Sequence, residues 1–149
     1  MWHGDPEAYD RALRDAGGTL ERLAHATRWR WQEAWRAVFA RPLHEATGRW
    51  RVDDHDWSVF SLDTVRSLKG ARALQAGADA MAAELIVMPD ADALPAFLLR
   101  GSRMPDLGLS RIDAWIAPTD LAWTLAFTHE DGALLPGPYF SRREWIVSA

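Results

Sequence analysis

Large and small side chains alternate most regularly in residues 121–128. A period of two over this stretch predicts a β-strand with one bulky and one small face. Residues 112–117 alternate in the same way, and Pro118-Thr119-Asp120 supplies turn chemistry between the two runs. We therefore predict a β-hairpin here. Its bulky side chains are Leu121, Trp123, Leu125 and Phe127.

Helical periodicity is strongest in residues 27–46. Large apolar residues recur there at helical spacing and would form one buried stripe. Pro42 removes a backbone hydrogen bond and crowds the preceding turn, so we expect the helix to end or kink near Ala40. The stripe consists of Trp31, Trp35, Val38 and Phe39.

Weaker patterns predict the remaining elements. Asp5 and Pro6 form a good helix start, which predicts a short helix over residues 5–16. Residues 85–88 are continuously apolar and predict a buried strand. The other expected helices are 19–26, 62–81 and a turn or two within 90–100. The other expected strands are 57–60, 139–140 and 145–147.

These elements together predict an α+β fold of one domain. We expect the N-terminal helices to pack on one face of a mainly antiparallel sheet that carries a C-terminal β-hairpin. A chain of 149 residues is long enough to bury one substantial core. That core is expected to combine Trp31, Trp35 and Phe39 with Trp123, Leu125 and Phe127.

Composition is that of a globular protein, with 48% hydrophobic and 26% charged residues. No apolar run approaches the roughly 18 residues that cross a bilayer, and the N-terminus lacks the pattern of a secretory signal. A cytoplasmic location without membrane contact is therefore expected. The chain has no cysteine, which excludes disulfides, thiolate catalysis and cysteine-bound metals.

Charge is distributed unevenly along the chain. The net charge is −4; residues 1–75 carry 12 basic and 11 acidic side chains, whereas residues 76–149 carry 5 and 10. An acidic protein gains little from counterion release on nucleic acid, so nucleic-acid binding is not expected. A basic protein partner would meet the acidic second half of the chain.

Polar side chains gather where the strand over 121–128 ends and where the chain returns through Gly137-Pro138. Because only short segments separate these positions, we predict that they surround one binding site. Its residues are Thr128, His129, Glu130, Tyr139 and Arg142.

His129 and Glu130 would point to opposite faces of a regular strand, with His129 on the bulky face. They would therefore make a poor catalytic pair. A catalytic His129 would need a partner such as Tyr139, Asp113 or Glu144. In the simpler interpretation, His129 hydrogen-bonds the loop backbone and Glu130 pairs with Arg142 or Arg143.

Metal and cofactor chemistry has little support in the sequence. The tract Asp53-Asp54-His55-Asp56 offers carboxylate and imidazole ligands, but without a recognised ligand spacing a solvated turn is the preferred interpretation. Phosphate-binding, dinucleotide-binding and nucleophile-elbow motifs are absent. We therefore predict no metal and no cofactor.

Several C-terminal motifs carry a resemblance to a known family. They are Asp113, Trp123-Thr124, Thr128-His129-Glu130 and Gly137-Pro138-Tyr139-Phe140, with a looser likeness in residues 35–40 and 57–60. In these motifs the chain resembles a family of small bacterial proteins that has no established activity. The resemblance implies the position of a site and no mechanism.

The sequence favours a small cytoplasmic bacterial binding or interaction protein over an enzyme, because no nucleophile, cofactor loop or metal spacing stands out. Small size and acidic charge are similar to those of immunity proteins that bind a toxin. The alternative is a hydrolase-like enzyme that uses His129 and Glu130.

Overall fold

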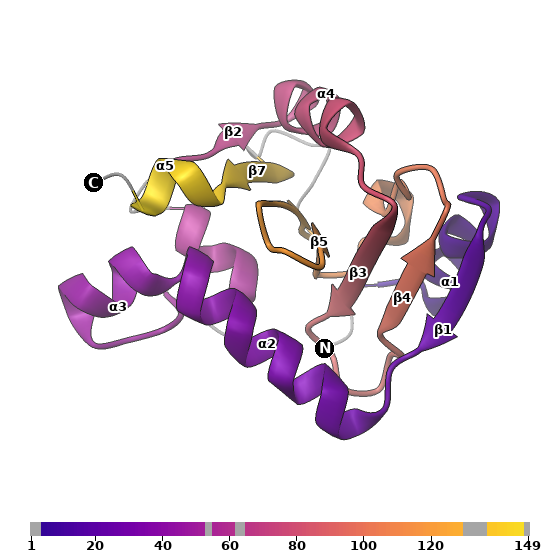
Figure 1. Cartoon of the computed structure of the whole chain (residues 1–149), viewed down its shortest axis with the longest axis horizontal. Helices are drawn as coiled ribbons and strands as arrows, with labels where there is room; N and C mark the ends of the chain where they lie inside the picture. Colours follow the sequence, from indigo (N-terminus) through magenta and orange to yellow (C-terminus); the bar gives the residue numbers. More distant parts are fainter. Residues whose placement is uncertain (1–3, 53–54, 62–64, 130–136, 148–149) are drawn as a thin grey trace.

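The protein forms one antiparallel sheet with helices on both faces (Figure 1). The computed structural model describes residues 4–52, 55–61, 65–129 and 137–147. The strand order is β1-β4-β3-β5-β6-β7-β2, and every neighbouring pair is antiparallel. The strands are β1 Thr19–Arg22, β2 Leu68–Lys69, β3 Glu84–Pro89, β4 Phe97–Arg100, β5 Ala114–Pro118, β6 Trp123–Phe127 and β7 Tyr139–Arg142.

Two groups of helices cover the two faces of the sheet. One face carries α2, α3, α5 and the 3₁₀-helix η1, and the other carries α1 and α4. The predicted α+β class, the antiparallel sheet and the C-terminal hairpin are confirmed, although the helices cover both faces instead of one. The helices are α1 Pro6–Asp15, α2 His25–Phe39, α3 Arg41–Thr47, η1 Asp56–Phe60, α4 Ala71–Ala80, η2 Gly108–Ser110 and α5 Arg143–Val147.

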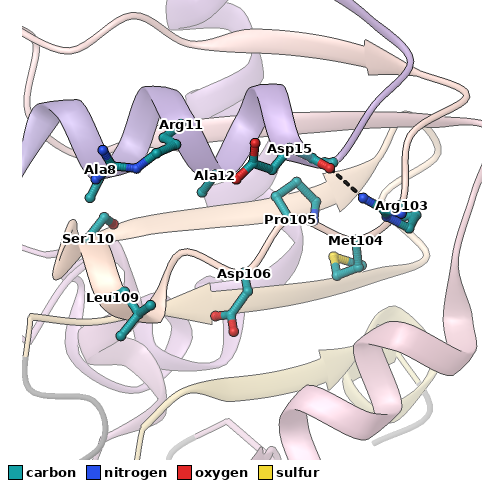
Figure 2. A pocket seen from close by; sticks show the side chains of 11 residues that line it. Ala8, Arg11, Ala12, Asp15, Arg103, Met104, Pro105, Asp106, Leu109 and Ser110 are labelled. Carbon is teal, nitrogen blue, oxygen red and sulfur yellow. Dashed lines mark hydrogen bonds between the residues drawn. The ribbon is translucent and has the colours of Figure 1, made fainter.

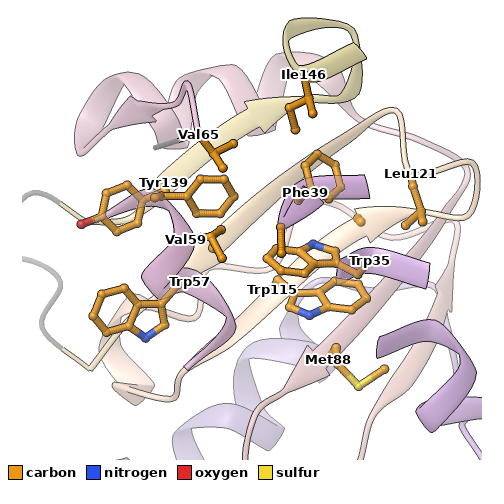
Figure 3. Packing of buried hydrophobic residues seen from close by; sticks show 14 of the residues in the cluster. Trp35, Phe39, Trp57, Val59, Val65, Met88, Trp115, Leu121, Tyr139 and Ile146 are labelled. Carbon is orange, nitrogen blue, oxygen red and sulfur yellow. The ribbon is translucent and has the colours of Figure 1, made fainter. Parts of the chain in front are cut away.

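Trp35 is the central side chain of the face beneath α2 (Figure 3). Its indole is fully buried and stacks on Trp115 of β5, with ring centroids 5.4 Å apart and an interplanar angle of 13°. Trp35 Nε1–H donates a 2.9 Å hydrogen bond to Thr124 Oγ1 on β6. The small side chains of Thr124 and Ala126 leave the room that this indole fills.

The predicted sharing of one core by Trp35 and Trp123 is wrong. Successive side chains of a strand point to opposite faces, so Trp123, Leu125 and Phe127 all lie on the face covered by α1 and α4. The tryptophans of α2 pack over the small face of β6 instead. On the bulky face Gly77 of α4 sits against Leu125: a Cβ at this position would lie only 2.9 Å from Leu125 Cδ2.

Elements with strong local signals are confirmed. The Asp5 side chain caps α1 by accepting hydrogen bonds from the backbone N–H groups of Glu7 and Ala8. The helix break falls at Ala40, between α2 and α3. The hairpin of β5 and β6 forms as expected, and Asp120 Oδ1 accepts a 3.0 Å hydrogen bond from Ala122 N in its turn.

Several short elements differ from their predictions. Residues 19–22 form β1 instead of a helix, residues 97–100 form β4, and residues 57–60 belong to η1 instead of a strand. The helix expected over 62–81 spans only α4, with β2 before it and residues 62–64 outside the described part. The strand expected at 145–147 is the helix α5. In these short segments pairing and packing with distant residues outweigh local propensity.

Hydropathy along the helices bears on membrane contact. Among the described residues, none of the helices combines the length and the apolar character that crossing a bilayer requires.

Tyr9 provides a pH-dependent test of how α1 packs. Its hydroxyl donates a 2.7 Å hydrogen bond to Pro95 O, and burial raises the pKa of Tyr9 well above its usual value. The protonated phenol is thus favoured in the folded state, so its contribution is complete below pH about 10 and declines as pH rises further. In urea titrations from roughly pH 8 to 11, the stability of wild type should fall toward that of Tyr9→Phe. Parallel pH profiles of the two proteins would contradict this packing.

Candidate functional site

Three neighbouring strands bring polar residues together at one end of the sheet, where the strand ends meet. Asp90 follows β3, Asp113 precedes β5, and His129 follows β6 after one residue. Because the strands are antiparallel, the end of β3, the start of β5 and the end of β6 lie side by side. Asp90 N donates to Asp113 O at 2.8 Å, and His129 N donates to Asp113 Oδ1 at 3.0 Å. Both bonds fix these residues relative to Asp113.

The 3₁₀-helix η1 adds His55 to the same end of the sheet. Two hydrogen bonds tie η1 to the strand ends: Trp57 Nε1 donates to Asp113 Oδ1 at 2.8 Å, and Asp56 N donates to Asp90 Oδ2 at 3.3 Å. His55 immediately precedes η1, and its ring lies 5.3 Å from that of His129, measured between centroids. We call His55, Asp90, Asp113 and His129 the His–Asp centre.

Asp113 stands between the two histidines of the centre. His129 Nδ1 lies 2.9 Å from Asp113 Oδ1 and 3.1 Å from Oδ2. His55 Nδ1 lies 3.6 Å from Asp113 Oδ2 and 3.4 Å from Asp90 Oδ2. All four residues are half-buried or better, with side-chain exposures between 10% and 30%.

Asp56, the first residue of η1, helps to position His55. Its carboxylate is buried, and Oδ1 accepts hydrogen bonds from Arg36 Nε at 2.9 Å and Arg51 Nε at 3.2 Å. Trp115 Nε1 donates to the other oxygen at 3.3 Å. These contacts compensate the charge of Asp56 and anchor η1, so that this residue positions His55.

Asp90 carries an electrostatic cost. Burial raises the pKa of the Asp90 carboxyl to about 6, against the opposing effect of its hydrogen bond with His55. The negative charges of Asp56 and Asp113 raise this pKa further. A positive charge beside Asp90, or a proton on it, would relieve the cost.

Arg28 of α2 holds the loop that presents Asp90. Its NH2 group donates to Pro89 O at 2.8 Å and to Ala91 O at 2.9 Å, on either side of Asp90, and its NH1 group donates to Leu94 O. One buried guanidinium thus fixes the chain that leads from β3 toward β4.

The predicted site residues are only partly brought together. Thr128 is buried directly before His129. Tyr139 reaches the region through Trp57, whose ring stacks on that of Tyr139 with centroids 6.2 Å apart (Figure 3). The ring of Trp57 lies 6.1 Å from that of His129. Arg142 lies opposite Trp123 at the far end of β6, with its guanidinium over Phe140. Glu130, and with it the predicted pairing to an arginine, falls outside the described residues.

The structure confirms one expected partner of His129 and corrects the expected position of its side chain. Asp113 is a partner of its ring, as one of the alternatives held. The placement of His129 on the bulky face is wrong: β6 ends at Phe127, and the imidazole lies beside Trp57 on the side of α2. The solvated turn expected around His55 is also wrong, since Asp56 is buried, while Asp53 and Asp54 lie outside the described part.

Sequence reasoning missed Asp90 as a member of the centre, and it considered His55 as a metal ligand within residues 53–56 but preferred a solvated turn. Side chains two residues apart on a strand lie on the same face. Asp90 comes two residues after Met88 and Asp113 two residues before Trp115, and both Met88 and Trp115 lie on the face covered by α2. Pairing the ends of these two strands would have joined the two carboxylates. No such pattern marks His55, because η1 has no repeat that fixes its partners.

Surface hollows in the described part of the chain also lie apart from the centre. One, of about 300 Å³, lies between α1 and residues 103–110 (Figure 2). Arg103 NH2 donates to Asp15 O at one end of it, and its polar side chains are of both signs. Another, of about 400 Å³, lies at the start of α2.

No protein-family model, curated protein or solved structure matches this chain. The resemblance to the bacterial family therefore stays a prediction.

Proposed function

We propose that this protein binds a divalent metal ion in the His–Asp centre. The observation that carries the proposal is the convergence of His55, Asp113 and His129: each offers one ligand atom, and these atoms all lie within 4.8 Å of one another. Among the described histidines and carboxylates, no other group of three does so. Asp90 stands beside them as a further oxygen ligand.

The spacing of the ligand atoms supports a small tetrahedral ion. Metal–ligand bonds of 2.0–2.2 Å in tetrahedral geometry place neighbouring ligands about 3.3 to 3.6 Å apart. His55 Nδ1 lies 3.4 Å from Asp90 Oδ2 and 3.6 Å from Asp113 Oδ2. The contact of 2.9 Å between His129 and Asp113 is shorter, so only a slight opening of this pair would admit the ion.

The donor set favours zinc. Imidazole nitrogen combined with carboxylate suits Zn²⁺, whereas Mg²⁺ and Ca²⁺ prefer oxygen ligands alone. The positive charge of such an ion would neutralise the partly buried carboxylates of Asp90 and Asp113 at these strand ends. The Nδ1 atoms of both imidazoles face these carboxylates, so neutral imidazoles and carboxylates could bind the ion together.

Calorimetric titration of the metal-free protein tests the proposal. We expect one Zn²⁺ per chain, weaker binding of Mg²⁺, and a loss of roughly 100-fold or more in Zn²⁺ affinity in His129→Ala. His44→Ala is the matched control, because His44 stacks on Trp50 outside the centre. Equal Zn²⁺ affinities of these two variants would overturn the proposal.

Two further functions stay predictions. The acidic second half of the chain supports binding of a basic protein, as an immunity protein binds its toxin; a neighbouring toxin gene and a tight complex in pull-down experiments would support this role. In the hydrolase-like alternative with His129 and Glu130, a zinc ion with one coordination position open to water would supply the nucleophile. Hydrolase activity that is lost in His129→Ala would favour that alternative.

A further inference from the structure

A second site is indicated at the start of α2, independently of the metal proposal. The hollow of about 400 Å³ there lies between the first turn of α2 and the residues that lead into β4. Its charged and titratable lining residues are Arg22, His25, Arg28 and Asp92. The lining therefore has more basic than acidic groups, in a protein whose net charge is −4.

The N-terminus of α2 has no side-chain cap. The cap position is Ala24, which offers no hydrogen-bonding side chain, and the first turn contains no acidic residue. The first backbone N–H groups of a helix have no partner within it, and they form the positive end of the helix dipole. Helix starts of this kind bind anions through these N–H groups.

Arg28 adds an uncompensated charge at the same place. The residue is only 6% exposed, and its guanidinium donates to the carbonyl oxygens of Pro89, Ala91 and Leu94. Its Nε–H is buried without a hydrogen-bond partner, and the guanidinium forms no ion pair with a described carboxylate. Buried charges are normally paired with an opposite charge, which carbonyl dipoles alone do not supply.

We propose that this hollow binds a phosphate group, held by the uncapped start of α2, by Arg28 and by Arg22 and His25 at its rim. A phosphate would supply the negative charge that Arg28 lacks. It would also accept hydrogen bonds from the backbone N–H groups of the first turn of α2, which have no partner within the helix. The hollow is larger than one phosphate, so the ligand class is a small phosphate monoester. Asp92 also lines the hollow, and its negative charge opposes binding of the anion.

NMR titration of the full chain with inorganic phosphate tests the site, with chloride at equal ionic strength as reference. We expect saturable shifts of the backbone amides of residues 25–27 and of the Arg28 Nε–H signal. The double variant Arg22→Gln/His25→Gln should weaken binding roughly tenfold or more. Arg72→Gln, which removes an exposed arginine on α4, should leave it unchanged.

A second variant keeps the fold while it blocks the site. Ala24→Asp places a capping carboxylate at the helix start, so it should raise the melting temperature and weaken phosphate binding together. Absence of saturable shifts, or equal phosphate affinity in wild type and Ala24→Asp, would overturn the proposal. Arg28 would then serve only to fix the loop after β3. Zinc binding at the His–Asp centre is measured separately, so the two sites can fail independently.

Discussion

Replacing Trp35 by alanine should lower the free energy of unfolding by about 3 to 5 kcal/mol, the largest stability effect that we expect of a single substitution. The indole is fully buried between α2 and the small face of β6. Its removal leaves a cavity beside Trp115, ends the stacking contact and leaves Thr124 Oγ1 without the donor Nε1–H. All of these contacts lie in one closely packed layer, so relaxation of the neighbouring side chains can recover little of the lost free energy.

Urea denaturation measures this loss, and Trp29→Ala is the matched control. Trp29 belongs to the same helix but is 57% exposed, so its replacement should change stability by less than about 0.5 kcal/mol. Equal losses in the two variants would remove Trp35 from the centre of the core.

Replacing Asp113 by asparagine should lower Zn²⁺ affinity by about 100-fold or more, as large a functional effect as that expected for His129→Ala. Asparagine keeps the volume of the side chain but removes its charge and one of its oxygen acceptors. Asp113 accepts from His129 N and from Trp57 Nε1, and its carboxylate faces the rings of His129 and His55. The substitution therefore removes a ligand and loosens two others.

Asp106→Asn is the control for this substitution. Asp106 is an exposed carboxylate outside the His–Asp centre, seven residues before Asp113, and its Oδ1 accepts a hydrogen bond from Gly108 N. Its replacement should leave the zinc titration unchanged. Zinc affinity that survives in Asp113→Asn would mean that the ion, if bound, is held elsewhere.

The elements that could be predicted from the sequence are those with long, unambiguous periodicity. The stripe of α2 and the alternation of β5 and β6 each extend over enough residues to define helix or strand. Asp5 and Pro42 mark their helix boundaries through local chemistry that does not depend on the rest of the fold.

The short elements could not be predicted, because distant partners determine them. Thr19–Arg22 becomes a strand only because β4 offers it hydrogen bonds, and η1 is stabilised by packing of Trp57 and Phe60 beneath α2. The alternation of β6 correctly separated its two faces, but it could not show which helix covers which face.

The candidate site divides in the same way. Asp113 could be predicted as a partner of His129, because both flank strands of one hairpin. Asp90 and His55 come from segments whose structure depends on tertiary pairing, so the metal-binding arrangement was not visible in the spacing of the tract around His55. Four residues from four separate segments converge only when the sheet is assembled.

Anomalous diffraction at the zinc absorption edge, recorded on crystals grown with Zn²⁺, tests the metal site most directly. We expect one strong peak among His55, Asp113 and His129, at about 2.0 to 2.2 Å from one nitrogen of each imidazole and from an oxygen of Asp113. A peak at another place on the surface, or no peak at the His–Asp centre in zinc-saturated protein, would contradict the proposed function.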